Sequence, residues 1–274
     1  MIRDIPFGLG ATSLTYPNLD LVENIRRTSD EFDLVELTLE YPRNLPLDDE
    51  KIGELNDLKA KKGLEYSVHL PLSIRLATTN PHLRSASVEV VAETYEKAER
   101  LDPLLYTLHV SPVYYPGGSP LTHLFEIKQF EDQLEKAKES LRELKEFLDP
   151  EKIAVENLFT DMRRLQGFLK SEGYRRCLDV GHLVKRGEDP VLHYYENSDS
   201  IINIHLHGVI EGNDHQQIEP ESESLNLVGL LEALQDRTYE GPIILEQFDP
   251  EHLSRSLATM ASAWKEVRVV GGNN

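Results

Sequence analysis

Nine histidine and carboxylate side chains of this sequence are candidate metal ligands. Three of the chain's ten histidines fall in the short segment 201–218, which also contains Asp214. A lone histidine in a strand is more often a hydrogen-bonded core residue than a ligand, and a lone carboxylate is usually a solvated charge. Imidazole and carboxylate groups together are the ligands that zinc, manganese and iron accept. We therefore predict a divalent metal centre from this set: His69, His109, Glu156, Asp179, His182, His205, Asp214, His215 and Glu246.

The number of bound ions decides which chemistry such a set supports. Two or three ions, bridged by Glu156 and Asp179, would activate a water and hold the attacking and leaving oxygens of a phosphodiester. This predicts a hydrolase that uses a metal-bound hydroxide, oriented by a carboxylate such as Glu156. One ion would instead suit a sugar or sugar-phosphate isomerase or epimerase, with Glu156 and Glu246 as the proton-transferring pair. A metal-free barrel that only binds a ligand is the third alternative.

The elements that must position these residues are eight short runs rich in Val, Ile, Leu or Tyr. Turn-forming or polar residues bound each run, which is typical of strands. Between them, apolar residues spaced three and four apart predict helices at 85–101, 124–148 and 250–267. The predicted strands span 7–14, 32–40, 65–72, 105–112, 152–159, 175–183, 201–209 and 241–248.

This alternation predicts a single (β/α)8 TIM barrel that forms one domain over residues 1–274. A doubly wound open sheet is the alternative, but no G-x-G-x-x-G motif follows any predicted strand. Alternate strand residues of a barrel point inward, and its active sites form where the strands end. His182, Asp214 and His215 would lie in loops beside these ends. Six consecutive strands carry a candidate ligand opposite bulky aliphatic residues: His69, His109, Glu156, Asp179, His205 and Glu246.

The charge balance and the cysteine count bear on partners and location. The chain has 48 acidic and 29 basic residues, a net charge of −19. Nucleic-acid binding draws on many Lys and Arg contacts to phosphates, so we expect a small-molecule substrate and no nucleic acid. The single cysteine, Cys177, fits a reducing compartment. No apolar run approaches the roughly 20 residues of a membrane span, and we expect a cytoplasmic protein.

The candidate ligands stand in motifs that resemble the xylose isomerase-like TIM barrels, which include the endonuclease IV-type enzymes of AP endonuclease family 2. The resemblance covers nearly the whole chain. VHLPLSIRLATTNPHLRSASVEVV resembles the family's third strand, loop and helix, with His69 in the ligand place. LHVSP resembles the fourth-strand segment and supplies His109. VENL, CLDVGH, HLHG and LEQF supply Glu156, Asp179 with His182, His205 and Glu246.

The resemblance implies one of two activities. Isomerases and epimerases of the family keep a central set, which here is Glu156, Asp179, His205 and Glu246. The phosphodiester-cleaving branch adds histidines on the third and fourth strands and an Asp-x-His after the seventh, and it holds up to three zinc ions. His69, His109 and His182 favour this branch, so we expect two or three zinc ions, with manganese or iron as alternatives. The chain reads Asn213-Asp214-His215 instead of Asp-x-His, which leaves the third metal position open.

Within the family, four segments are most similar to the cobamide-remodelling phosphodiesterases: FGLGATSLTYP, LVELTLE, VHLPL, and HLHGV followed by Asp-His. This narrower resemblance implies cleavage of the phosphodiester in the nucleotide loop of a corrinoid. It agrees with the acidic composition, because a DNA-cleaving relative needs a basic surface.

Four further residues are predicted to contact the substrate. Arg75 follows the third strand and would bind a phosphate group, although a solvent-facing loop charge explains it equally well. Tyr114 and Tyr115 lie in the long segment 111–123, a candidate lid, and would stack on a flat ligand. His207 points inward by strand parity but stands beyond the ligand position of the family. Glu36 and Glu40 end the second strand, close enough to the mouth for a contact with substrate hydroxyls, but neither is selected as a site residue.

Overall fold

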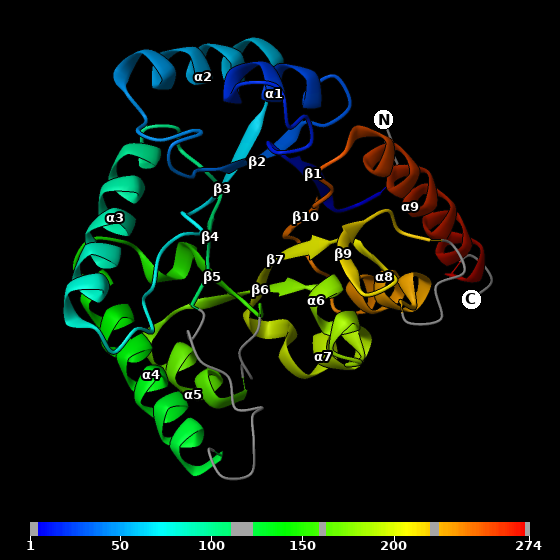
Figure 1. The fold of residues 1–274 in the computed structure, drawn as a ribbon. Helices are drawn as coiled ribbons and strands as arrows, with labels where there is room; N and C mark the ends of the chain where they lie inside the picture. Colours follow the sequence, from blue (N-terminus) through cyan, green and yellow to red (C-terminus); the bar gives the residue numbers. More distant parts are fainter. Residues whose placement is uncertain (1–4, 111–122, 159–162, 220–224, 272–274) are drawn as a thin grey trace.

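The structure is a computed structural model that describes residues 5–110, 123–158, 163–219 and 225–271. Within these residues, eight parallel strands close into a barrel in the order β1-β10-β7-β6-β5-β4-β3-β2 (Figure 1). The predicted (β/α)8 barrel is therefore confirmed. The barrel strands are β1 (Gly8–Thr12), β2 (Leu34–Thr38), β3 (Glu65–His69), β4 (Tyr106–Leu108), β5 (Ile153–Glu156), β6 (Arg175–Asp179), β7 (Ile201–Leu206) and β10 (Pro242–Leu245).

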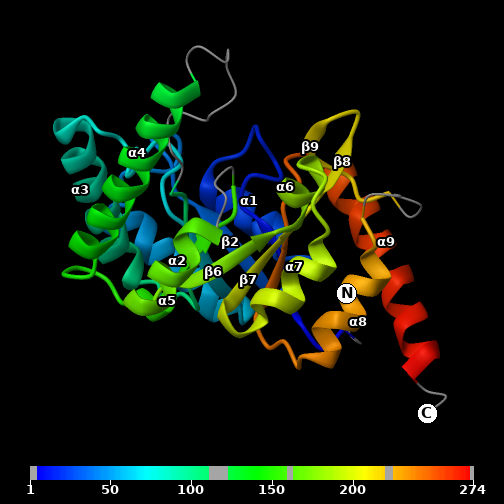
Figure 2. The same cartoon turned by 90° about the horizontal axis from the view of Figure 1, so that it is seen from below.

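Helices surround the barrel and connect its strands (Figures 1 and 2). Polar caps fix where they start, as Asp48 does for α2 by accepting the backbone N–H of Lys51 at 2.9 Å. Gly63 ends the same helix at a φ of 68°, in the left-handed region that glycine adopts without strain. No described helix is both long and apolar enough to cross a membrane. The helices are α1 (Leu21–Thr28), α2 (Asp49–Lys62), α3 (Pro81–Glu99), α4 (His123–Leu144), α5 (Arg163–Glu172), α6 (Val180–Lys185), α7 (Pro190–Asn197), α8 (Leu227–Asp236) and α9 (Pro250–Gly271).

Two elements near the carboxyl ends of the strands differ from the sequence prediction. The run 175–183 divides into β6 and α6, because Asp179 accepts the N–H of His182 and so starts a helix directly after the strand. The prediction that His182 lies in a loop is therefore wrong. The polar stretch after β7 forms an antiparallel hairpin of β8 (Gly208–Ile210) and β9 (Asn213–Gln216), so the loop prediction for Asp214 and His215 is also wrong. Strands of three and four residues are too short to show a period of two.

The barrel interior is polar just below the mouth. Glu36, Ser67, Thr107 and Asn203 are at most 1% exposed, and the last three lie within 3.3 Å of the Glu36 carboxylate. TIM barrels usually fill this space with branched aliphatic side chains. Buried polar groups are almost always paired. Here they hold the Glu36 carboxylate in place, so this layer supports the residues above it.

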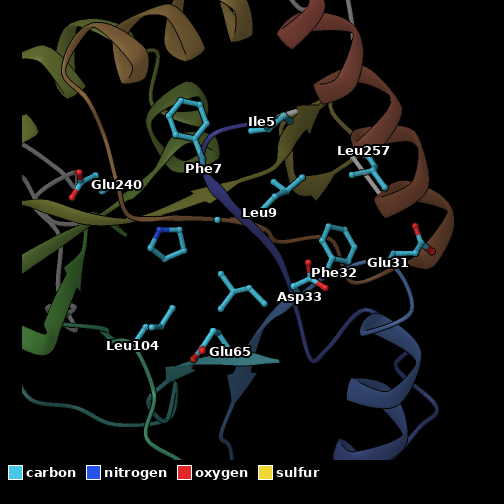
Figure 3. Close-up of a pocket in the computed structure, with 13 residues that line it drawn as sticks. Ile5, Phe7, Leu9, Glu31, Phe32, Asp33, Glu65, Leu104, Glu240 and Leu257 are labelled. Atoms are coloured by element: carbon cyan, nitrogen blue, oxygen red, sulfur yellow. The ribbon is translucent and has the colours of Figure 1, made fainter. Parts of the chain in front are cut away.

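A cavity of about 750 Å³ opens at the opposite end of the barrel, among the first residues of the strands (Figure 3). Phe7, Leu9 and Phe32 line it together with carboxylates such as Glu31 and Glu240. Its lining includes none of the nine candidate ligands. The two ends of the barrel therefore differ: the amino-terminal end is partly apolar, and the candidate ligands gather at the carboxyl end.

Candidate metal centre

The candidate ligands meet at the barrel mouth in one continuous cluster. Among the described residues, five groups of three side chains have ligand atoms within 4.8 Å of one another. The groups overlap through shared members, and eight of the nine candidate ligands belong to them. The groups are His69–His109–Glu156, Glu156–Asp179–His182, Glu156–Cys177–His205, Asp179–His205–Glu246 and His182–His207–His215.

The centre of this cluster lies around the ring of His205. Its Nδ1 is 3.5 Å from Oε2 of Glu156 and 3.3 Å from Oε2 of Glu246, and Asp179 completes the group. This nitrogen is buried and makes no well-formed hydrogen bond within the described residues, although buried polar atoms are almost always paired. A divalent ion among these atoms would satisfy the nitrogen and neutralise the carboxylates. The donor set therefore fits a metal ion.

A second group lies towards β3 and β4. Oε2 of Glu156 is 3.3 Å from Nε2 of His69 and 3.0 Å from Nε2 of His109. Nδ1 of His69 faces the Leu70 carbonyl oxygen at 2.8 Å, so Nδ1 must carry a proton. In neutral His69, the lone pair of Nε2 would then point at a carboxylate oxygen. A second proton or a bound cation relieves this repulsion.

A third group lies towards α6 and the β8–β9 hairpin. The rings of His207 and His215 stack at 4.3 Å, and the ring of His182 is 5.5 Å and 5.7 Å from them. His215 has a φ of 56°, a conformation uncommon outside glycine. Asp214 stands outside the five groups: its Oδ2 lies 2.9 Å from Nζ of Lys185 and 3.7 Å from Nδ1 of His182.

His207 lies behind Asp179 and is wholly buried. Its Nε2 is 3.2 Å from Oδ2 of Asp179, and its Nδ1 accepts the backbone N–H of His215 at 2.9 Å. Because protein atoms engage both nitrogens, the geometry favours support of Asp179 over the predicted contact with substrate. A Cβ at Gly181 would lie 2.0 Å from this ring, so only glycine allows α6 to approach it.

Two residues that sequence reasoning does not select also belong to the site. Nε2 of His205 lies 2.9 Å from Oε1 of Glu36, which leaves Nδ1 of the ring facing the centre. Asn157 exchanges two hydrogen bonds with the backbone of Asp179, at 2.6 and 2.9 Å. A signal existed for both, since Glu36 stands in the predicted second strand and Asn157 directly follows Glu156 in VENL.

The histidines set the charge state of the carboxylates. Burial alone would raise the pKa of Glu156, but His109, His69 and His205 hold that pKa well below its ordinary value. Burial likewise opposes ionisation of Glu246, and His205 and His215 lower its pKa strongly. Both carboxylates are therefore anionic at neutral pH, which is the form that ligates a metal ion.

The other predicted substrate contacts lie apart from this cluster or outside the described residues. Arg75 is exposed, and its Nη1 donates to the carbonyl oxygen of Ile74 at 2.8 Å. Tyr114 and Tyr115 lie outside the described residues. Glu40 accepts backbone N–H groups of Leu72 and Ser73, so it caps the loop after β3.

Solved structures with a similar fold include several sugar epimerases. A D-tagatose 3-epimerase-like protein is 22% identical, with a TM-score of 0.76 over 95% of this chain and 98% of that chain. An L-ribulose 3-epimerase is 18% identical, with a TM-score of 0.66 over 96% and 93%. The D-psicose 3-epimerase of Clostridium cellulolyticum H10, solved with D-tagatose, is 16% identical, with a TM-score of 0.70 over 96% and 99%.

These structures do not support the narrower resemblance to cobamide-remodelling phosphodiesterases, and no curated protein sequence matches the chain. The family itself is clear, because residues 27–266 match the family described as "Xylose isomerase-like TIM barrel". With the barrel and the buried His, Glu and Asp cluster, the chain belongs to the xylose isomerase-like TIM barrel family.

Proposed function

We propose that the chain is a divalent-metal-dependent enzyme that acts on a small polar substrate at the barrel mouth. Two reactions fit such a site: hydrolysis of a phosphodiester, and epimerisation or isomerisation of a sugar. The solved structures favour the second reaction, and the composition of the site favours the first.

The solved relatives support sugar epimerisation. Their names describe 3-epimerases, and one was solved with D-tagatose. Glu156, Asp179, His205 and Glu246 would hold one ion beside the sugar. Glu156 and Glu246 approach the same nitrogen of His205 and would remove and return a proton next to the sugar carbonyl. At 22% identity or less, this likeness carries the fold, and the substrate is our inference.

The surplus of histidines supports phosphodiester hydrolysis. Four ligands are enough for one ion, yet the site has a further group, His69–His109–Glu156, and two additional histidines, His182 and His215. A single oxygen, Oε2 of Glu156, lies within 3.3 Å of both His69 and His109, and this observation is the main support for the hydrolase alternative. A lone sugar-binding ion gives no role to that pair.

Several divalent ions together supply a nucleophilic water and neutralise the charge of a phosphodiester. Glu156 and Asp179, which are shared between groups, would bridge neighbouring ions. Glu246 is 9% exposed and would face the bound substrate. We conclude that epimerisation or isomerisation of a sugar is the better supported reaction, and that hydrolysis of a small phosphodiester, with zinc as the expected metal, is the second candidate.

The test combines a metal count with two assays. Protein purified without chelator is analysed for metal per chain, then assayed with bis-p-nitrophenyl phosphate and for solvent-deuterium exchange into D-tagatose. Hydrolysis predicts two or more ions, turnover of the phosphodiester, and loss of that turnover in His109→Ala. Epimerisation predicts one ion, exchange into the ketose, and exchange that survives His109→Ala.

Glu246→Gln is the shared control, since it removes a central ligand and should abolish whichever activity is present. Metal-replete protein that does not turn over the phosphodiester would refute the hydrolase, and equal turnover with and without His109 would refute the role of that histidine. Protein that binds no divalent metal would refute both reactions and leave a binding protein.

A further inference from the structure

Arg176 is a buried cation far from the candidate metal centre. It lies near the start of β6, paired with Val155 and Ile201, and only 3% of it is exposed. Its Nη2 lies 3.0 Å from Nε2 of His193 on α7, so the side chain points out of the barrel into the helix layer. Asp179 is the last residue of the same strand and lies at the barrel mouth, at the opposite end of β6.

The guanidinium group of Arg176 has no anionic partner in the described part of the chain. Its Nη1 is buried without a hydrogen bond, and no carboxylate forms an ion pair with it. His193 accepts a hydrogen bond but brings no negative charge; burial and then Arg176 lower its pKa to about 4, so its ring is neutral at neutral pH. A buried charge without a counter-charge is strongly unfavourable, so this arginine needs an explanation.

Arg176 is also one of the residues that line a polar cavity of about 230 Å³, between α5, α7 and the turn that precedes β7. Four cationic side chains line this cavity, Arg176 with Lys170, Arg175 and Arg237, against three carboxylates. One carboxylate, Glu151, already lies 3.1 Å from Nε of Arg175. The lining therefore has a positive balance on a chain whose net charge is −19.

We propose that this cavity binds a small tetrahedral oxyanion, either inorganic phosphate or the phosphate group of a small ester. Arg176 is the buried cation of the lining, and Lys170 and Arg237 supply charge at the rim. Guanidinium groups bind phosphate through paired N–H donors. In Arg176, Nη2 is held by His193, and Nη1 has no hydrogen-bond partner among the described residues. The site is separate from the metal centre and independent of the reaction proposed there.

Thermal unfolding of the metal-loaded protein tests the site by titration with inorganic phosphate. Wild type is compared with Arg176→Met and with Arg255→Met, a control that removes an exposed charge paired with Glu251 on α9. Phosphate should raise the melting temperature of wild type and Arg255→Met with saturation, and Arg176→Met should lose that shift. Phosphate bound to the metals, or acting as a general stabilising salt, would shift all three proteins alike.

Arg237→Gln, at the exposed rim, keeps the test valid if Arg176→Met does not fold. It should weaken phosphate affinity, measured by calorimetry, by about tenfold, because it removes one charged donor. A repeat with glycerol phosphate separates the two sources, since tighter binding of the ester identifies an organic phosphate. Equal shifts in all variants, or no saturable binding by wild type, would overturn the proposal.

Discussion

Nε2 of His205 lies 2.9 Å from Oε1 of Glu36, and both side chains are buried inside the barrel. The other oxygen of Glu36 is held by Ser67, Thr107 and Asn203 at 3.2 to 3.3 Å. The carboxylate thus fixes the His205 ring from below and turns Nδ1 towards Glu156 and Glu246. Carboxylates in this position set the tautomer of a metal-binding histidine and raise its basicity.

Glu36→Gln should lower the affinity for zinc by roughly 10- to 100-fold, as the loss of such a partner typically does. The amide is neutral and no longer favours the tautomer that exposes Nδ1. Competition with a chromogenic chelator measures the affinity. Thr107→Val is the matched control: it removes one contact to Glu36 without touching His205, and should change affinity much less. Equal affinities in Glu36→Gln and wild type would show that His205 needs no such support.

Removal of metal should destabilise the protein, because the mouth then holds buried carboxylates without a cation. Metal at 100 times its dissociation constant adds about 2.7 kcal/mol to the free energy of unfolding. Calorimetry with and without chelator should therefore show a lower melting temperature after chelation, reversed by zinc. His109→Ala should reduce this difference, since it removes one ligand group. An equal melting temperature with and without chelator would argue against a metal centre.

Gly181→Ala should destabilise the protein by about 1–3 kcal/mol, the usual cost of overpacking. The added Cβ would lie 2.0 Å from the ring of His207, which must then move away from Asp179. Gly53→Ala on α2 is the control, since its Cβ meets nothing within 4 Å. That change should stabilise the helix by about 0.5–1 kcal/mol. Urea unfolding of the two variants should give shifts of opposite sign.

His193 should make the protein less stable as the pH falls from about 6.5 towards 4. Burial and then Arg176 lower its folded-state pKa to about 4, against 6.5 ordinarily. Between these values the unfolded chain binds a proton that the folded chain does not, so unfolding is favoured. Above pH 6.5 the histidine is neutral in both states and the effect vanishes.

Urea unfolding at pH 7 and pH 5 measures this effect. From pH 7 to pH 5, the free energy of unfolding should fall more for wild type than for His193→Gln. The glutamine keeps a hydrogen-bond acceptor for Arg176. His82→Gln, on the exposed first turn of α3, is the matched control. A pH difference unchanged by His193→Gln would mean that this histidine takes up its proton in the folded state.

The sequence by itself determined the barrel and most members of the cluster. Eight apolar strands that alternate with amphipathic helices can bury their apolar surfaces in only a few architectures, and a closed parallel barrel is one of these. Strand parity then decided which side chains face inward, which is how His69, Glu156 and His205 could be chosen. Parity is a local property with a period of two residues, so it survives without knowledge of the fold.

Only the tertiary structure decided which of these side chains share an atom or support one another. Glu36 and His205 are far apart in the chain and meet because β2 and β7 lie across the barrel interior. Two short elements also depend on contacts that leave no periodic signal in the sequence. The hairpin that carries His215 depends on strand pairing, and the helix that starts after Asp179 depends on capping. That Arg176 lacks an anionic partner among the described residues is likewise invisible in sequence, because an arginine's partners are set by the packing of distant helices and strands.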